Sequence, residues 1–148
     1  MDWMGFFADA VDKIHKDLAE VVVNAAGCRE GWLQGELFLA GRERGLRVNE
    51  CAIGHRKKAD LSFGDPPTMV AEIKIIGAGY FPKQQYALEE DVNRMRRFAG
   101  RNAERYMILV IPSSDLKTRL GTYLNDCTFS RRKIDRSWDG FRLRIWKL

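Results

Sequence analysis

Residues 69–76 read MVAEIKII and form the most informative stretch of the chain. Side chains of a β-strand alternate between the two faces of a sheet, so Glu72 and Lys74 point to the same side. The opposite side carries a row of apolar side chains suited to packing under helices, namely Met69, Ala71, Ile73 and Ile75. The pattern predicts a strand with one buried face and one face that carries a carboxylate and an ammonium.

A turn precedes this strand. Residues 62–68 read SFGDPPT, in which prolines cannot donate ladder hydrogen bonds and a glycine tolerates turn conformations. A strand over residues 57–63, KKADLSF, would return antiparallel through this turn. That return would bring Asp60 beside Glu72 and Lys74.

Two carboxylates and a lysine set this way suit the hydrolysis of a phosphodiester bond. Mg²⁺ prefers oxygen ligands, commonly one or two carboxylates together with phosphate oxygens of the substrate. Asp60 and Glu72 would supply the carboxylates, and Lys74 would orient or activate the attacking water and offset charge in the transition state. The alternative interpretation is a solvated ion pair on a strand, which contributes little to stability.

The same residues resemble the PD-(D/E)XK nuclease superfamily, the restriction-endonuclease-like fold, in which an acid ends one strand and an acid-x-lysine follows on the next. The resemblance covers roughly residues 28–112 and is carried by Asp60, Glu72 and Lys74. It implies a metal held by both carboxylates and by the Ile73 carbonyl. Mg²⁺ is the implied cofactor, with Mn²⁺ as a substitute.

Many members of that family also carry a glutamate on the helix before these strands. Glu36, on the helix predicted over residues 29–44, is the candidate here for a catalytic role at a second metal or its water. Because Leu33 and Leu37 flank it on the buried stripe, Glu36 could equally lie at the edge of that stripe. The chain departs from the family pattern at Ala59, where the family name has proline.

Basic residues supply candidate contacts to a nucleic-acid backbone. The candidates lie before Asp60, near the start of a predicted helix and in the basic C-terminal region: Arg56, Lys57, Lys58, Lys83, Arg131, Arg132 and Lys133. Residues 131–140, RRKIDRSWDG, are predicted to be a loop that grips phosphates. Solvated charges at a hairpin tip and at a sheet edge are the alternative for both regions.

The remaining elements follow from hydrophobic periodicity and turn residues. Helices are expected over 2–26, 29–44 and 83–98 and from Ser113 or Ser114 to residue 125; strands are expected over 46–53, 57–63, 68–76, 104–112 and 141–148. Within the third helix, Glu90 and Arg94 are spaced for an ion pair. The fold class is therefore α/β, a mixed β-sheet flanked by helices, and the resemblance implies a restriction-endonuclease-like core.

Composition predicts one domain over residues 1–148, because 45% hydrophobic and 30% charged residues are an ordinary globular balance. The net charge of +5 favours a polyanionic partner. Three widely separated cysteines argue against a disulfide framework. Without the form of a signal peptide or a membrane-spanning run, the protein is expected to be soluble, intracellular and cytoplasmic, with no membrane partner.

These observations favour a metal-dependent nuclease, an endodeoxyribonuclease with DNA as its nucleic-acid partner, although DNA and RNA are not distinguished. A homodimer through the segment 1–27 and an additional protein partner are open alternatives, and core packing is the other use of that segment. A noncatalytic nucleic-acid-binding or inhibitor protein that reuses the nuclease fold is the alternative function. A structural module that binds nucleic acid through its basic C-terminal region is the third.

Overall fold

The computed structural model describes residues 1–25, 27–77, 81–98, 100, 102–115 and 119–148. Its helices are α1 (Trp3–Asn24), α2 (Arg29–Gly41), the 3₁₀ turn η1 (Arg42–Arg44), α3 (Phe81–Arg97) and α4 (Arg119–Asp126). Its strands are β1 (Leu46–Val48), β2 (Ala52–Gly54), β3 (Lys57–Lys58), β4 (Leu61–Phe63), β5 (Met69–Ile75), β6 (Glu104–Pro112), β7 (Lys133–Trp138) and β8 (Phe141–Lys147). Among the described residues, no helix combines the length and apolarity that a bilayer crossing requires.

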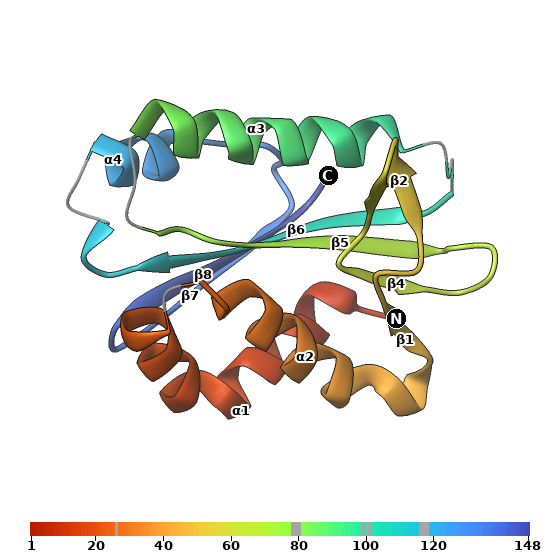
Figure 1. Ribbon diagram of the computed structural model, residues 1–148, viewed down its shortest axis with the longest axis horizontal. Coiled ribbons are helices and arrows are strands. Elements are labelled where there is room, and N and C mark those ends of the chain that lie inside the picture. Colours follow the sequence, from red (N-terminus) through yellow and green to blue (C-terminus); the bar gives the residue numbers. More distant parts are fainter. Residues whose placement is uncertain (26, 78–80, 99, 101, 116–118) are drawn as a thin grey trace.

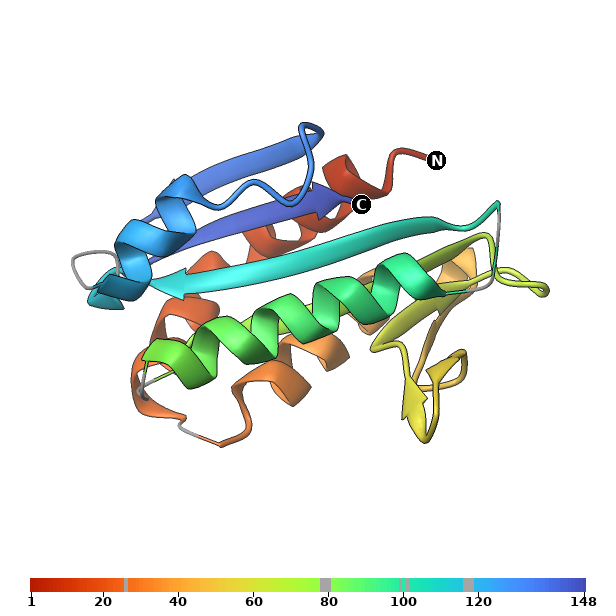
Figure 2. The same cartoon turned by 90° about the horizontal axis from the view of Figure 1, so that it is seen from above.

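One mixed sheet forms the centre of the molecule, with strand order β1-β4-β5-β6-β8-β7. β5 and β6 are parallel, and the other neighbouring strands are antiparallel. Helices α1 and α2 cover one face of the sheet, and α3 and α4 cover the other (Figure 1). Seen from above, α3 runs along β5 and β6 (Figure 2). This arrangement confirms the expected mixed α/β class.

The core has a layer on each face of the sheet, and the alternation of β5 predicted the apolar row of one of them. Met69, Ala71, Ile73 and Ile75 pack under α1 and α2. β6 supplies both layers, because Ile108 and Val110 face α1 and α2 while Met107, Leu109 and Ile111 pack with α3 and α4. The continuous apolar run of β6 is therefore that of a strand covered on both faces. α1 also buries its apolar stripe here, which is the core-packing use of this segment: Trp3, Phe7, Val11, Leu18 and Val22.

The two strands expected over 46–53 and 57–63 are each broken in the structure. Asn49 adopts a left-handed backbone (φ 50°), a conformation that asparagine tolerates better than most residues, and so turns the chain out of the sheet after β1. β2 and β3 then form a separate two-stranded antiparallel ribbon before the chain re-enters the sheet as β4. Asp60 lies at the point of re-entry.

The segment 131–140 is not the loop that the sequence predicted, because residues 133–138 form edge strand β7. A turn through Asp139 and Gly140 (φ 96°) joins β7 to β8 as a hairpin. Trp138 stacks on Phe141 and its indole N–H donates to Asp12 at 3.0 Å. The side chains of this segment are thus partly committed to internal contacts.

Candidate active site

The candidate site lies where β5 loses one of its neighbours. β4 pairs with β5 only as far as Ala71, so beyond that residue β6 is the one strand the structure describes alongside β5. The N–H groups of β5 that point to this open edge have no strand partner in the described part of the chain and need other acceptors. The Ile73 N–H donates to Asp60 Oδ2 at 2.7 Å, and the Ile75 N–H donates to Glu30 Oε1 at 3.0 Å. Two carboxylates therefore occupy the open edge of β5.

Asp60 is held in place by its backbone as well as by its side chain. Its carbonyl accepts a hydrogen bond from the Gln34 side chain at 2.9 Å and another from the Asn49 N–H at 3.3 Å. The break in the predicted strand thus fixes the position of the carboxylate. Asp60 is thus held by the turn residue Asn49, by the side chain of Gln34 on α2 and by the backbone of β5.

Glu72 lies next to Asp60 and is buried, with 8% of its surface exposed. Burial is the largest cause that raises the pKa of Glu72, to about 9, and the neighbouring Asp60 carboxyl adds to it through repulsion and a hydrogen bond. Asp91 raises this pKa further, and Arg94 opposes the rise. Two carboxyls so close together require a shared proton or a cation between them.

Lys74 points to the same side as Glu72 and reaches α3. Its Nζ lies 2.9 Å from Asp91 Oδ2, and Asp91 Oδ1 accepts from Arg94 at 2.7 Å. Burial lowers the pKa of Lys74, but Asp91 and the charges of Glu30 and Glu72 outweigh that effect and leave the pKa above its ordinary value. Lys74 is therefore an ammonium at neutral pH.

The oxygen donors of this edge fit a hard divalent cation. A residue in a strand directs its N–H and C=O to the same side, so the Ile73 carbonyl faces the same open edge as its N–H, beside Asp60. Asp60, Glu72 and that carbonyl would leave the remaining positions of a Mg²⁺ ion to water or phosphate oxygens. Among the described residues, no group of three or more His, Cys, Asp or Glu side chains is arranged to hold a metal ion, so the set is a pair of carboxylates.

The structure brings Asp60, Glu72, Ile73 and Lys74 together, but it places Glu36 elsewhere. Glu36 lines a groove of about 630 Å³ between α1 and α2. The positions of α2 that reach β5 and Asp60 are Glu30 and Gln34, four residues apart on one helix face. Sequence reasoning missed Glu30, because the helix pattern does not show which acid beside the buried stripe faces β5.

The ion pair on α3 also differs from the expected one. Arg94 pairs with Asp91, three residues away, rather than with Glu90. Glu90 is exposed, whereas the side chain of Asp91 is 15% exposed and faces Lys74. Asp91 and Arg94 are therefore, with Glu30, residues of the site that sequence reasoning missed in this role.

The basic candidates are divided between separate regions. Arg56, Lys57 and Lys58 lie on the β2–β3 ribbon, which leads directly into Asp60. Lys83 is exposed in the first turn of α3. Arg131, Arg132 and Lys133 lie before and on β7, separated from β5 by β8 and β6. The ribbon is therefore the basic segment adjacent to the site.

No family model, curated protein or solved structure matches this chain. Function must therefore be inferred from the residues of the site and their geometry.

Proposed function

We propose that this chain is a divalent-metal-dependent nuclease of the PD-(D/E)XK type that hydrolyses phosphodiester bonds in DNA. The observation that carries the proposal is the convergence of Asp60, Glu72 and Lys74 at an open strand edge, although Asp60 belongs to a different segment of the chain. Burying two carboxyl groups that repel each other lowers the stability of the folded protein, so their presence here favours a functional role. A bound cation would remove that cost and create the charge needed to bind phosphate.

Each residue has a distinct role in this proposal. Asp60, Glu72 and the Ile73 carbonyl would hold Mg²⁺, which when bound supplies positive charge to the scissile phosphate and lowers the pKa of water. Lys74 retains its three protons, and Asp91 accepts one of its hydrogen bonds. The remaining N–H groups can donate to a phosphate oxygen and to the attacking water. Lys74 thus stabilises developing charge and orients water rather than removing its proton.

The direct test is cleavage by the purified protein of plasmid, linear duplex and single-stranded DNA and of RNA, with Mg²⁺, Mn²⁺ or EDTA. We expect cleavage that needs the metal and is lost in Lys74→Met. Lys16→Met, at an exposed position of α1, is the matched control and should cleave normally. Both variants should retain cooperative unfolding. Cleavage in EDTA, equal cleavage by Lys74→Met, or no cleavage of any substrate would contradict the proposal.

A noncatalytic binding or inhibitor protein is the second candidate, favoured by one observation. The ammonium of Lys74 already has a carboxylate partner in Asp91, as in a purely structural ion pair. For such a protein, Lys74→Met should leave nucleic-acid or partner binding unchanged and no substrate should be cleaved. The same set of substrates and variants therefore separates the two functions.

A further inference from the structure

The β2–β3 ribbon is an anchored projection rather than a loose loop. Its base is fixed by Ile53 and Ala59, which are buried in a small cluster with Val70 of β5 and Met95 of α3. Gly54 lies against the stem of Arg94. Beyond this base, residues 54–58 are all exposed, and the ribbon extends away from the sheet and helices (Figure 2). The molecule therefore presents a short, supported hairpin to solvent.

The exposed part of the ribbon carries concentrated positive charge. It comprises Gly54, His55, Arg56, Lys57 and Lys58. Within the described part of the chain, neither an ion pair nor a side-chain hydrogen bond engages Arg56, Lys57 or Lys58. A basic surface that is free of internal partners is suited to phosphate and base edges.

We propose that the β2–β3 ribbon enters the major groove of B-form duplex DNA, with Arg56 at its tip against base edges and Lys57 and Lys58 against phosphates. The position of the scissile phosphate relative to the ribbon rests on the proposed nuclease function, whereas the binding of the ribbon to DNA does not. It identifies the element that would select duplex DNA over other nucleic acids.

The dimensions of the ribbon agree with that groove. Gly54 and His55 carry the chain beyond its anchor at Ile53, a reach of about 7 Å, and the major groove is about 8.5 Å deep. Two strands about 4.8 Å apart, with their side chains, fit a groove about 12 Å wide. The major groove of A-form RNA is deep and narrow, so the same ribbon should be excluded from duplex RNA.

The ribbon is also tied to the candidate catalytic centre. Lys58 is two residues from Asp60, a separation of at most about 7 Å along the chain. Because Ala59 is buried between them, the ribbon and the carboxylate should move together. The groove contacts and the scissile phosphate would then lie within a few base pairs of each other.

Arg56→Gly gives a clean test because Arg56 has a left-handed backbone (φ 55°) that glycine adopts without strain. The variant removes the tip side chain while leaving the turn conformation at least as accessible. Binding to a short DNA duplex is measured by fluorescence anisotropy in EDTA, so that cleavage plays no part. Lys16→Ala, which removes an exposed charge on α1, is the control.

We expect Arg56→Gly to weaken duplex binding about tenfold to hundredfold, with an unchanged or higher melting temperature and no comparable loss in Lys16→Ala. Adding Lys57→Ala should reduce the slope of log affinity against log salt by about 1. Wild-type affinity for duplex DNA in Arg56→Gly, or no duplex binding by the wild type, would overturn the proposal even if the protein cleaves nucleic acid.

The groove itself is tested with competing ligands and a matched RNA duplex. Methyl green, which occupies the major groove, should displace the protein, whereas netropsin in the minor groove should not. Duplex RNA and single-stranded DNA should bind more weakly than duplex DNA. Equal binding to the RNA duplex, or competition by netropsin alone, would refute the placement of the ribbon. If the wild-type protein binds the major groove but cleaves no substrate, the nuclease function alone would be refuted.

Discussion

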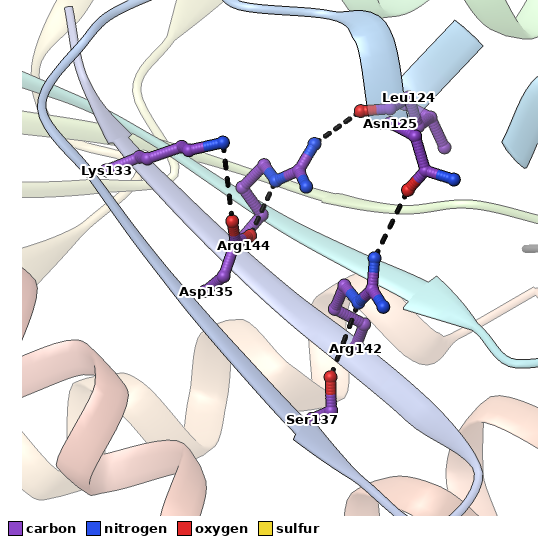
Figure 3. Close-up of polar contacts among 7 residues, drawn as sticks. All are labelled: Leu124, Asn125, Lys133, Asp135, Ser137, Arg142 and Arg144. Carbon is purple, nitrogen blue, oxygen red and sulfur yellow. Dashed lines mark hydrogen bonds and ion pairs between the residues drawn. The ribbon is translucent and has the colours of Figure 1, made fainter. Parts of the chain in front are cut away.

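Two ion clusters of similar composition stand on the same sheet, and each joins one carboxylate to two cations. They are Lys74–Asp91–Arg94 on β5 and α3, and Lys133–Asp135–Arg144 on β7 and β8 (Figure 3 shows the second). The contacts of the central carboxylate range from 2.7 to 2.9 Å in the first cluster and from 2.6 to 3.5 Å in the second. Their surroundings, however, differ in charge.

The cluster around Arg144 has more cations than carboxylates and is structural. Arg144 is 4% exposed, donates to Asp135 and to the Leu124 carbonyl in the last turn of α4, and lies over the Trp146 ring. Neighbouring Arg142 makes two more polar contacts, to Asn125 and Ser137 (Figure 3). Arg144, which donates to a carbonyl in the last turn, and Arg142, which donates to the Asn125 side chain, fasten α4 to the sheet.

The cluster around Lys74 is surrounded by more acid than it can neutralise. Asp60, Glu72 and Glu30 lie on the same strand edge as Lys74, and the burial of Glu72 beside Asp60 raises the pKa of Glu72. The Arg144 cluster is therefore completed by the protein's own residues, whereas the Lys74 cluster has a negative excess that an external cation would balance.

The largest expected difference between the clusters is in catalysis. Under the proposed function, Glu72→Gln should reduce metal-dependent cleavage by about 10²- to 10³-fold, because it removes a negative oxygen of the proposed metal site while preserving side-chain shape. Asp135→Asn, the corresponding change in the Arg144 cluster, should leave the cleavage rate per folded molecule unchanged. Cleavage rates at matched concentrations of folded protein measure both effects. Equal losses in the two variants would remove the functional distinction.

The sequence predicted the strand at the centre of the Lys74 cluster because a two-residue period sets both faces of β5. Met69 and Ile73 face the core, and Glu72 and Lys74 face the other way, as expected. A different pattern, a continuous apolar run, predicted β6 over residues 104–112, and the structure has this strand at the same bounds. Periodicity succeeds where burial alone determines the side-chain pattern.

Sequence reasoning failed where distant segments decide the structure. The break after Asn49 depends on backbone hydrogen bonds to residues about ten positions away, which no local period encodes. The choice of Glu30 rather than Glu36 depends on the rotation of α2 against the open edge of β5, and the choice of Asp91 depends on Lys74, which reaches α3 from β5. The helix pattern predicts a buried stripe but not which acid at its border meets a partner.

The next difference is in stability. Arg144→Met should lower the free energy of unfolding by about 3 kcal/mol, because it leaves Asp135 and the Leu124 carbonyl without their buried donor. Arg142→Met, two residues away on the same strand face, should cost less than about 1 kcal/mol because its contacts are exposed. Urea unfolding of the two variants measures the difference. Similar costs would show that burial does not distinguish the two arginines.

A smaller effect should appear in the pH dependence of stability. The pKa of Glu72 is about 9 in the folded protein against an ordinary value of 4.5, so the folded state binds the extra proton between these values. The contribution of Glu72 to the free energy of unfolding is therefore fully present below pH 4.5 and is lost as pH rises toward 9, with a limiting slope of about 1.4 kcal/mol per pH unit.

Urea unfolding between pH 6 and 8 in EDTA should show this decline in the wild type and a flatter profile in Glu72→Gln. Mg²⁺ should reduce the decline in the wild type, because a bound cation replaces the shared proton. Asp135→Asn should keep the wild-type slope and so serves as the control from the other cluster. Parallel profiles for the wild type and Glu72→Gln would contradict the burial of a repelled carboxyl.

The smallest expected effect concerns how α3 holds Lys74. Asp91→Asn keeps an acceptor but removes the charge that joins Lys74 to Arg94, so cleavage should fall about tenfold rather than disappear. Asp91→Glu should recover part of the rate, because it restores the charge although its longer side chain shifts the carboxylate. The reduction should lie in kcat rather than in KM, since Lys74 is expected to act on developing charge. If Asp91→Asn cleaves at the wild-type rate, the ion pair on α3 is only structural, and the two clusters resemble each other more than their surroundings indicate.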